Sequence, residues 1–330
     1  MKVVGVNGFG RIGRYFTRMS LKKTGVSVAV VNDLADIKTL AHLLKYDSVH
    51  RQIDEAFEVL GDTIVFENGS KIVFTQFQNP EDIPWGKYGV EVVIESTGLF
   101  RTEEAASSHF KGGAKKVIIS APGRGDNIKS VVLGVNEDVL TEDDKVISNA
   151  SCTTNSAAPL VKLISKMCKI DSAYITTVHS YTSDQRLHDA PHKDLRRARA
   201  AAESIVPTTT GAAKALTKIF PELEGHIGGC GIRVPVPDGS LTDLTLTVEG
   251  KVPTVEEINT EFKRASENEL KGILSYTDEP IVSSDIIGNP HSCIFDSQLT
   301  SVVGNLVKLV GWYDNEAGYS NRLIELVKIV

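Results

Sequence analysis

The stretch Val6-Asn7-Gly8-Phe9-Gly10-Arg11-Ile12-Gly13 decides the fold of the N-terminal half. It ends a short apolar run over 2–7, which is typical of a buried strand, and opens a helical pattern that continues to Lys22. In a G-x-G-x-x-G turn the first glycine permits the tight turn, the second lets the backbone approach a pyrophosphate, and the third lets helix pack on strand. Amide groups at the start of the helix then face the phosphate. The stretch therefore predicts a dinucleotide-binding unit.

The next strand, expected over Val26–Val31, ends at Asn32 and Asp33. An acidic residue about 20 positions after the last glycine binds the ribose hydroxyls of adenosine, and its charge repels a 2′-phosphate. The sequence thus favours NAD over NADP. A second interpretation makes Asp33 the cap of a helix expected over 35–44, and Asn32 or Asp33 can serve both purposes.

The rest of this half continues the alternation of strands and helices. Asn68-Gly69 lies between apolar runs over 62–74 and predicts a hairpin that interrupts the parallel pattern. Further strands are expected at 90–95, 116–120, 131–133 and 145–147. The first of these leads into Ser96-Thr97-Gly98, at the sheet edge where cofactors bind. The pattern predicts an α/β fold with a doubly wound, mostly parallel sheet of the Rossmann type.

A lone cysteine stands among small hydroxyl and amide residues in Ser148-Asn149-Ala150-Ser151-Cys152-Thr153-Thr154-Asn155, just before an apolar helical pattern over 160–168. A thiol near the positive end of a helix is favoured as thiolate, which predicts a nucleophile. The alternative is a small buried cysteine in a turn. Pro159 leaves two helix starts open: it is either the first helical residue or a kink in a helix that begins nearer Cys152.

The second half carries three features that suit anions. His188–Arg199 is dense in charge; propensity predicts a helix over 192–204, whereas a loop that holds an anion or a neighbouring subunit, or a solvated charged face, fits equally. Thr208-Thr209-Thr210-Gly211 precedes a helix expected over 212–220 and suits phosphate. Arg233 lies in an apolar strand, where an unpaired guanidinium is costly, so an anionic partner is expected.

The remaining elements of this half predict a second, α+β domain. A strand over 172–178 ends at His179, which on its own is most often a satisfied residue at a strand end. Strands over 241–248 and 306–312 and a helix over 254–269 predict an antiparallel sheet covered by helices. The last helix, over 319–330, is amphipathic. A chain of 330 residues is expected to form two domains, and we place the boundary just before Cys152.

Bulk composition excludes several classes of protein. A formal net charge of -6 argues against general nucleic-acid binding, and no apolar run is long enough to span a bilayer. The amino terminus is not expected to be a signal peptide. Four widely spaced cysteines without a C-x-x-C pair predict neither a disulfide framework nor a metal site. We therefore expect a cytoplasmic protein that binds neither membrane nor nucleic acid.

The motif Ser148–Asn155 closely resembles the active-site motif of phosphorylating glyceraldehyde-3-phosphate dehydrogenase. The resemblance covers essentially the whole chain, through the segments 6–13, 44–48, 191–197, 207–214 and 312–316. It implies an NAD-binding Rossmann domain of residues 1–150 with 315–330, whose C-terminal helix packs back on it. It also implies a catalytic domain of residues 151–314 and a homotetramer. The segment around Arg197 is then an extended loop that reaches the cofactor of a neighbouring subunit.

The resemblance also implies a task for each residue. Cys152 attacks the aldehyde of D-glyceraldehyde 3-phosphate to form a thiohemiacetal, and His179 is the base that also keeps the thiolate ionised. Hydride transfer to NAD leaves a thioester, which inorganic phosphate converts to 1,3-bisphosphoglycerate. The implied site for the substrate phosphate is Thr182 and Arg233 with Asp184, and that for the attacking phosphate is Ser151, Thr153, Arg197, Thr210 and Gly211. The implied cofactor residues are Asn7, Gly8, Phe9, Gly10, Arg11, Ile12, Asp33, Thr97, Gly98, Ser120, Asn315 and Tyr319.

Three alternatives stay open beside this interpretation. Erythrose-4-phosphate dehydrogenase shares the cysteine and the cofactor but releases its thioester to water. Retention of Thr208–Ala212 and His179–Thr182 favours the triose-phosphate enzyme. An NADP-preferring gluconeogenic paralogue is the second alternative, because Ala190-Pro191 replaces the Leu-Pro of many NAD-specific relatives. The third is a non-catalytic thiol sensor that binds a dinucleotide.

Overall fold

The computed structural model describes residues 1–330 and forms two compact units. The first unit consists of Met1–Val131, Glu137–Ala150 and Ser320–Val330, and the second of Val132–Asn136 and Ser151–Tyr319. None of the helices combines the length and the apolar character that crossing a membrane requires.

The first unit is built on a 9-stranded sheet. Its helices and strands are β1 (Lys2–Asn7), α1 (Arg11–Lys22), β2 (Val26–Asn32), α2 (Ile37–Lys45), β3 (Tyr46–Asp47), β4 (Arg51–Gln52), β5 (Phe57–Leu60), β6 (Thr63–Phe66), β7 (Lys71–Thr75), β8 (Val92–Glu95), α3 (Glu103–Ser107), β9 (Lys116–Ile119), β10 (Lys129–Ser130) and β11 (Val146–Ser148). The strand order is β10-β11-β9-β8-β1-β2-β7-β6-β5. Only β5–β6 and β6–β7 pair antiparallel, so the predicted mostly parallel Rossmann-type sheet is confirmed, and the hairpin at Asn68-Gly69 joins β6 to β7.

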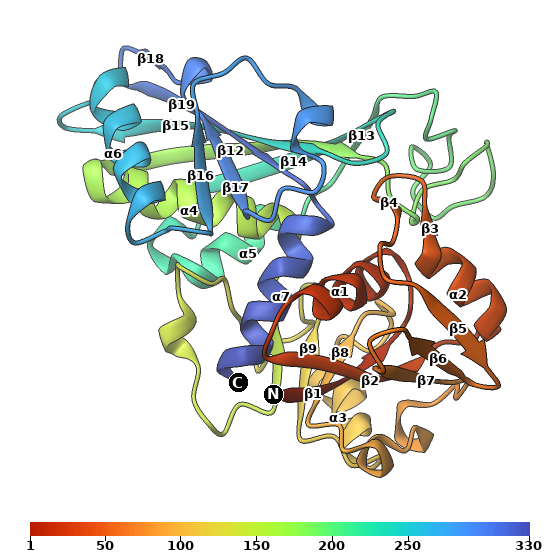
Figure 1. Ribbon diagram of the computed structural model, residues 1–330. Helices are drawn as coiled ribbons and strands as arrows, with labels where there is room; N and C mark the ends of the chain where they lie inside the picture. The colour runs from red at the N-terminus through yellow and green to blue at the C-terminus, as the bar shows by residue number, and fades with distance from the viewer. The chain divides into compact units, whose positions relative to one another are not determined.

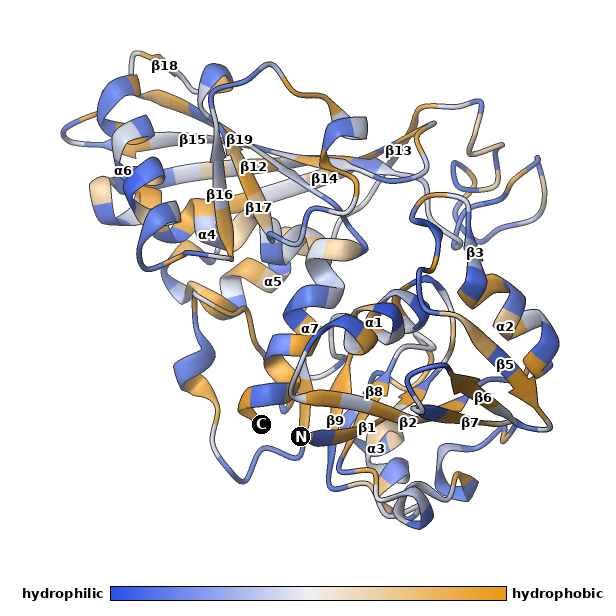
Figure 2. Cartoon of the chain, in the orientation of Figure 1, coloured by the Kyte–Doolittle hydropathy of each residue, from blue (hydrophilic) through white to orange (hydrophobic).

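The core of this unit lies on the central strands. Val4, Val6, Ile94 and Val117 are fully buried, because strands flanked by helices on both faces need apolar side chains on both faces. Figure 1 shows α1 and α2 on one side of the sheet and α3 on the other. The same strands carry the densest apolar colouring of this unit in Figure 2.

Two local predictions in this unit were wrong. Helix α2 is capped by Asp36, whose carboxylate accepts from the Thr39 amide at 3.0 Å, and not by Asp33. Asp36 is the cap because it immediately precedes Ile37, the first helical residue, and an N-cap occupies that position. The strand expected at 131–133 is instead β10, two residues earlier.

The second unit is built on an 8-stranded sheet with the order β13-β14-β12-β15-β19-β17-β16, and β18 pairs with β19. Its helices and strands are α4 (Cys152–Met167), β12 (Lys169–Ser180), β13 (Val206–Thr208), α5 (Ala212–Ile219), β14 (Ile227–Val234), β15 (Ser240–Glu249), α6 (Val255–Glu267), β16 (Leu274–Thr277), β17 (Cys293–Asp296), β18 (Ser301–Val303), β19 (Leu306–Tyr313) and the start of α7 (Ala317–Ile329). Figure 1 shows α4, α5 and α6 on the same side of this sheet.

This sheet is mixed, whereas the sequence predicted an antiparallel one. The β12–β14 and β16–β17 pairs are parallel, and the other pairs are antiparallel. A parallel pair needs a crossover connection, and α5 supplies it between β12 and β14. No α-helix covers the opposite face of the sheet, where Leu241, Asp243, Thr245 and Thr247 are only partly buried.

The charge-dense segment between β12 and β13 forms neither a helix nor a strand, so the helix that propensity predicts over 192–204 is wrong. Short side chains bind the backbone there in place of helical carbonyls. Asp194 accepts from the Arg196 amide at 2.9 Å, and Asp189 accepts from the Ala200 amide at 2.9 Å. Such local bonds compete with the helical ladder and hold an irregular loop.

Candidate active site

Helix α4 places the cysteine at its N-terminus. Cys152 is the first helical residue, and the cap is Ser151, whose hydroxyl accepts from the Thr154 amide at 3.0 Å. Pro159 lies inside the helix, which continues past it to Met167 although the proline has no amide hydrogen to donate. The open question about the helix start is thereby resolved in favour of Cys152, and the thiol lies at the positive end of the helix dipole.

His179 lies near the end of β12, and its Nε2 is 3.5 Å from the sulfur of Cys152. Its Nδ1 lies 2.7 Å from the carbonyl oxygen of Ser180. Nδ1 also faces a donor, Arg233 Nη1, so its two neighbours fit either tautomer; with the ring proton on Nδ1, that nitrogen donates to the Ser180 carbonyl. The lone pair of Nε2 then faces the thiol, as a general base requires.

Arg233 lies beside this pair. Its Nη1 lies 2.5 Å from His179 Nδ1 and donates to the Ser180 carbonyl at 3.0 Å. Burial, together with the positive charge of Arg233, lowers the pKa of His179 to about 3. The imidazole is therefore neutral at physiological pH.

Burial around Cys152 favours the neutral thiol, whereas the helix start favours the thiolate that the sequence predicts. Burial raises the pKa of Cys152, and this outweighs the charge of Arg233 and the hydrogen bonds from Thr153, which act the other way. The lowered pKa of His179 likewise disfavours a resting thiolate–imidazolium pair. A thiol that faces a neutral imidazole can become a nucleophile by passing its proton to Nε2.

The predicted anion-binding residues form a connected group in the same unit. Asp184 accepts hydrogen bonds from the Thr182 hydroxyl and the Arg197 guanidinium. Although burial opposes it, the bond from Thr182 and the charges of Arg233 and Arg197 lower the pKa of Asp184. Arg197 is thus the ion-pair partner of Asp184, while the charge of Arg233 acts on the same carboxylate without a direct bond.

One residue of the predicted threonine cluster and one residue that the sequence analysis missed complete this region. Thr208, from the predicted cluster, accepts from Arg197 Nε at 3.0 Å and so ties the loop to β13. Tyr313 is buried at the end of β19, and its hydroxyl lies 2.9 Å from Thr153 Oγ1 and 2.8 Å from Thr177 Oγ1. Tyr313 thereby fixes the residue next to Cys152, a long-range contact that no local pattern reveals.

The remaining phosphate candidates lie at helix starts. Thr210 accepts from the Ala212 amide at 3.2 Å, and Gly211 caps α5 without a side chain. Ser151 and Thr153 occupy the start of α4, where their hydroxyls already bond to Thr154 and Tyr313. Both places offer backbone amides at the positive end of a helix.

The glycine turn of the first unit has the shape that a pyrophosphate requires. Gly8 has φ +91, and a Cβ on Gly13 would lie 2.2 Å from the Gly8 carbonyl oxygen, so both must be glycine. A Cβ on Gly10 would meet nothing within 4 Å, which leaves open space above the turn. Gly10 also caps α1 without a side-chain bond, so the first amides of the helix are available to an anion. The residues present therefore fit a dinucleotide.

Several predicted cofactor residues use their side chains inside the protein instead. Asn7 is buried and bonds to Glu95 and Asn32 at 2.7 and 2.9 Å. Arg11 forms a two-point ion pair with Asp47, at 2.5 and 3.1 Å, and despite burial this bond lowers the pKa of Asp47 to about 2. Because the side chains of Asn7 and Arg11 are bonded within the protein, a cofactor would contact mainly the backbone of these two residues.

The other cofactor candidates of the first unit lie at strand ends of its sheet. Asp33 accepts from the Phe9 amide at 2.7 Å, which joins the acid to the glycine turn. Ile12 lies in the first turn of α1. Thr97, Gly98 and Ser120 follow β8 and β9. The structure thus gathers these residues at the carboxyl edge of the sheet, where such folds bind ligands.

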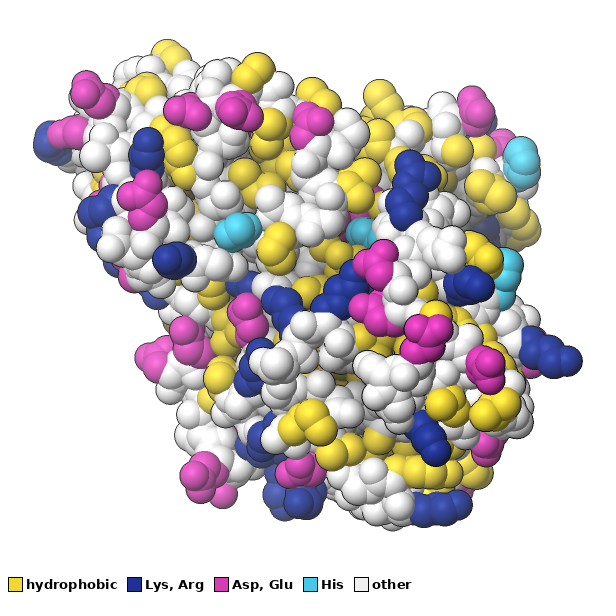
Figure 3. Space-filling model, in the orientation of Figure 1, with side chains coloured by type: hydrophobic (Ala, Val, Ile, Leu, Met, Phe, Trp, Pro, Cys, Tyr) yellow, Lys and Arg dark blue, Asp and Glu magenta, His cyan; other side chains and the backbone are white.

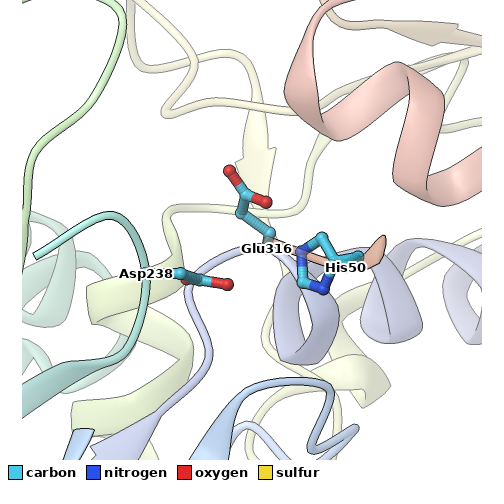
Figure 4. Close-up of side chains that lie close together, drawn as sticks. All are labelled: His50, Asp238 and Glu316. Carbon is cyan, nitrogen blue, oxygen red and sulfur yellow. The ribbon is translucent and has the colours of Figure 1, made fainter. Parts of the chain in front are cut away.

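Asp238 and Glu316, both labelled in Figure 4, lie in the second unit in a buried carboxyl cluster that also includes Asp314. Burial, followed by the negative charges of Asp314 and Glu316, raises the pKa of Asp238 to about 9. Asp238 is therefore protonated at neutral pH and hydrogen-bonds to Asp314, which in turn accepts from the Gly288 amide at 2.7 Å. This cluster holds the segment that carries Asn315.

Asp238→Asn is expected to stabilise the protein increasingly as pH rises from 5 to 8. Above the ordinary pKa of 3.8 the folded protein holds a proton that the unfolded chain has lost, so each pH unit costs the parent up to about 1.4 kcal/mol. The asparagine amide still donates a hydrogen bond to Asp314, and it does not titrate, so this loss of stability with pH is absent from the variant. Melting temperatures of variant and parent at pH 5, 6.5 and 8 test this, with the exposed Asp278→Asn as control. A difference that does not change with pH would contradict it.

The fold and the family models place the protein in the class of NAD-dependent dehydrogenases. The model of the NAD-binding domain of glyceraldehyde 3-phosphate dehydrogenase matches residues 2–103, and that of its C-terminal domain matches residues 151–315. The chain belongs to the glyceraldehyde-3-phosphate dehydrogenase family, whose members oxidise glyceraldehyde 3-phosphate with NAD.

Relatives from several bacteria match over nearly their full length. The chain is 53% identical over 330 residues to glyceraldehyde-3-phosphate dehydrogenase 2 of Streptomyces avermitilis, which covers 99% of this chain and 98% of the relative. It is 52% identical to glyceraldehyde-3-phosphate dehydrogenase of Geobacillus stearothermophilus, with 99% and 97% covered. It is also 52% identical to that of Mycobacterium avium, with 99% and 98% covered.

Proposed function

We propose that Cys152 and His179 carry out the phosphate-dependent oxidation of glyceraldehyde 3-phosphate. The observation that carries this proposal is the 3.5 Å distance between the sulfur and Nε2 at the start of α4. In this proposal the neutral imidazole carries its ring proton on Nδ1, which donates to the Ser180 carbonyl, so that Nε2 can take the thiol proton.

The first chemical step forms a carbon–sulfur bond. As the sulfur of Cys152 adds to the aldehyde carbon, its proton passes to His179 Nε2, which gives it to the new alkoxide oxygen. This yields a thiohemiacetal and restores the neutral imidazole. His179 then removes the hydroxyl proton while the carbon loses hydride, and a thioester remains on Cys152. Bound NAD supplies the acceptor for that hydride.

The second step consumes the thioester. A phosphate oxygen attacks the acyl carbon, the carbon–sulfur bond breaks, and the departing sulfur regains a proton from His179. We assign the substrate phosphate to Thr182 and Arg233, oriented by Asp184. We assign the attacking phosphate to Ser151, Thr153, Arg197, Thr210 and Gly211. The support for both assignments is that Arg197 and Arg233 both neighbour Asp184.

For the cofactor, we propose that the glycine turn holds the pyrophosphate and that Asp33 binds the adenosine ribose. The full set is Asn7, Gly8, Phe9, Gly10, Arg11, Ile12, Asp33, Thr97, Gly98, Ser120, Asn315 and Tyr319. Asn315 donates its amide to the nicotinamide carboxamide in this proposal. The acid at Asp33 supports NAD over NADP.

We further propose a cytoplasmic homotetramer. The support is the sheet face of the second unit that no helix covers, with partly buried Leu241 and Thr245 suited to a second copy. Acidic and basic side chains are interspersed over the face shown in Figure 3, which suits neither nucleic acid nor an anionic membrane.

A steady-state assay with NAD or NADP, each with and without phosphate, tests this function. The rate with glyceraldehyde 3-phosphate is expected to depend on phosphate or arsenate, and to be higher with NAD, because the thioester needs an anionic acceptor and Asp33 repels a 2′-phosphate. A rate that ignores phosphate would show that water takes the acyl group, as in erythrose-4-phosphate dehydrogenase. A higher rate with NADP would overturn the cofactor assignment.

A further inference from the structure

The side chain of Asn315 is held by two serine hydroxyls. Its Oδ1 lies 2.8 Å from Ser180 Oγ and 2.7 Å from Ser240 Oγ. Ser180 ends β12 and Ser240 begins β15, the neighbouring strand, while Asn315 follows β19. All three residues belong to the second unit and are at least nine-tenths buried.

The hydroxyls determine which way the amide of Asn315 faces. Ser240 Oγ accepts from the Ser180 backbone amide at 3.2 Å, so its own hydrogen must go to another atom. For both serine hydroxyls, Asn315 Oδ1 is the acceptor in reach. With the amide reversed, two buried hydroxyl hydrogens would face N–H groups and lack an acceptor, which is strongly unfavourable. The oxygen therefore faces the serines.

The amide nitrogen of Asn315 consequently faces away from the serines. It makes no hydrogen bond within the chain and is not among the buried atoms that lack a partner, so it reaches open space. Asn315 thus presents donors and no acceptor to a ligand. A carboxamide offers one oxygen and one NH₂ group, and only its oxygen can bind a donor.

We propose that Ser180 and Ser240 are positioning residues that lock Asn315 as a donor, so that it selects one orientation of the nicotinamide carboxamide. This inference rests on the proposed role of Asn315 toward NAD. Locking the carboxamide also fixes which face of the nicotinamide ring meets the substrate carbon. Ser180 serves the base as well, but through its backbone carbonyl, which an alanine substitution leaves in place.

The test uses Ser180→Ala, Ser240→Ala and the double variant of the full-length enzyme. NAD dissociation constants, measured by calorimetry without substrate, are expected to rise about 3- to 10-fold for each single variant, as loss of one hydrogen bond predicts. The double variant is expected to transfer deuterium from C1-deuterated glyceraldehyde 3-phosphate to both faces of the nicotinamide, read by NMR, whereas the parent uses one face. Ser172→Ala, at an exposed hydroxyl of β12, is the matched control and is expected to match the parent.

Two further variants separate the possible failures. Asn315→Asp keeps the shape but replaces the donors with acceptors, and it is expected to weaken NAD binding more than either serine variant. If Asn315→Asp binds NAD as the parent does, the proposed role of Asn315 fails. If it weakens binding while the serine variants keep the parental affinity and transfer to a single face, the positioning inference fails alone. Should the double variant not fold, the single variants and Asn315→Asp still decide the matter.

Discussion

Cys152→Ser is expected to lower kcat by about 10³-fold or more while leaving NAD affinity unchanged. The imidazole of His179, with its pKa lowered to about 3, is a weak base that a thiol can use but an alcohol cannot. A serine alkoxide at this position would also sit in the same buried environment that already disfavours the thiolate. Steady-state kinetics and NAD calorimetry on the same preparation measure the two quantities.

The matched control is Cys168→Ser, at the opposite end of the same helix α4, where the sulfur donates only to the Ile164 carbonyl at 3.4 Å. This variant is expected to keep parental kcat. Turnover by Cys152→Ser within tenfold of the parent would show that another group forms the covalent intermediate. Loss of NAD affinity in Cys152→Ser would show that the substitution disturbed the fold, so the loss of turnover could not be assigned to the nucleophile.

The sequence predicted most of the first unit because its signals are local. Gly8 and Gly13 are required by the backbone of the turn itself, so the glycine pattern in the sequence is enough to predict the turn. The parallel strand order follows from the alternation of strands and helices. The cap of α2 was predicted wrongly because Asp33 and Asp36 are both residues that can cap a helix. Only the position of the first helical residue decides between them.

The charges of the site could not be predicted, because they depend on contacts distant in sequence. Arg233 lies 54 residues from His179, yet it lowers the pKa of that imidazole. Burial decides the state of Cys152 against the helix dipole, and burial is a property of the folded unit. The sequence also could not show that the side chains of Asn7 and Arg11 are bound within the protein. Asn7 bonds to Glu95 and Arg11 to Asp47, which only the folded structure reveals.

His179→Gln is expected to lower kcat/KM by about 10²- to 10⁴-fold near neutral pH and to change its pH dependence. In the parent, the imidazole stays neutral well above its pKa of about 3 and the thiol stays protonated, so the reacting form does not change between pH 5 and 8. The parental profile of kcat/KM should be flat there. Without the base, only thiolate formed in advance can react, and its fraction rises about tenfold per pH unit below the thiol pKa.

The variant should therefore regain part of its activity as pH rises, but it should stay below the parent, because the thiohemiacetal hydroxyl still lacks its base. Alkylation of Cys152 by iodoacetamide, followed over the same range, reports the thiolate directly and should rise with pH in both proteins. His226→Gln is the control, because that exposed histidine of the same unit contacts only the Asp171 carbonyl, at 2.7 Å. If instead the parent were to lose activity and alkylation together below pH 6, the resting site would be a thiolate–imidazolium pair. The direction of both pKa shifts would then be wrong, whereas the contact between sulfur and Nε2 would stand.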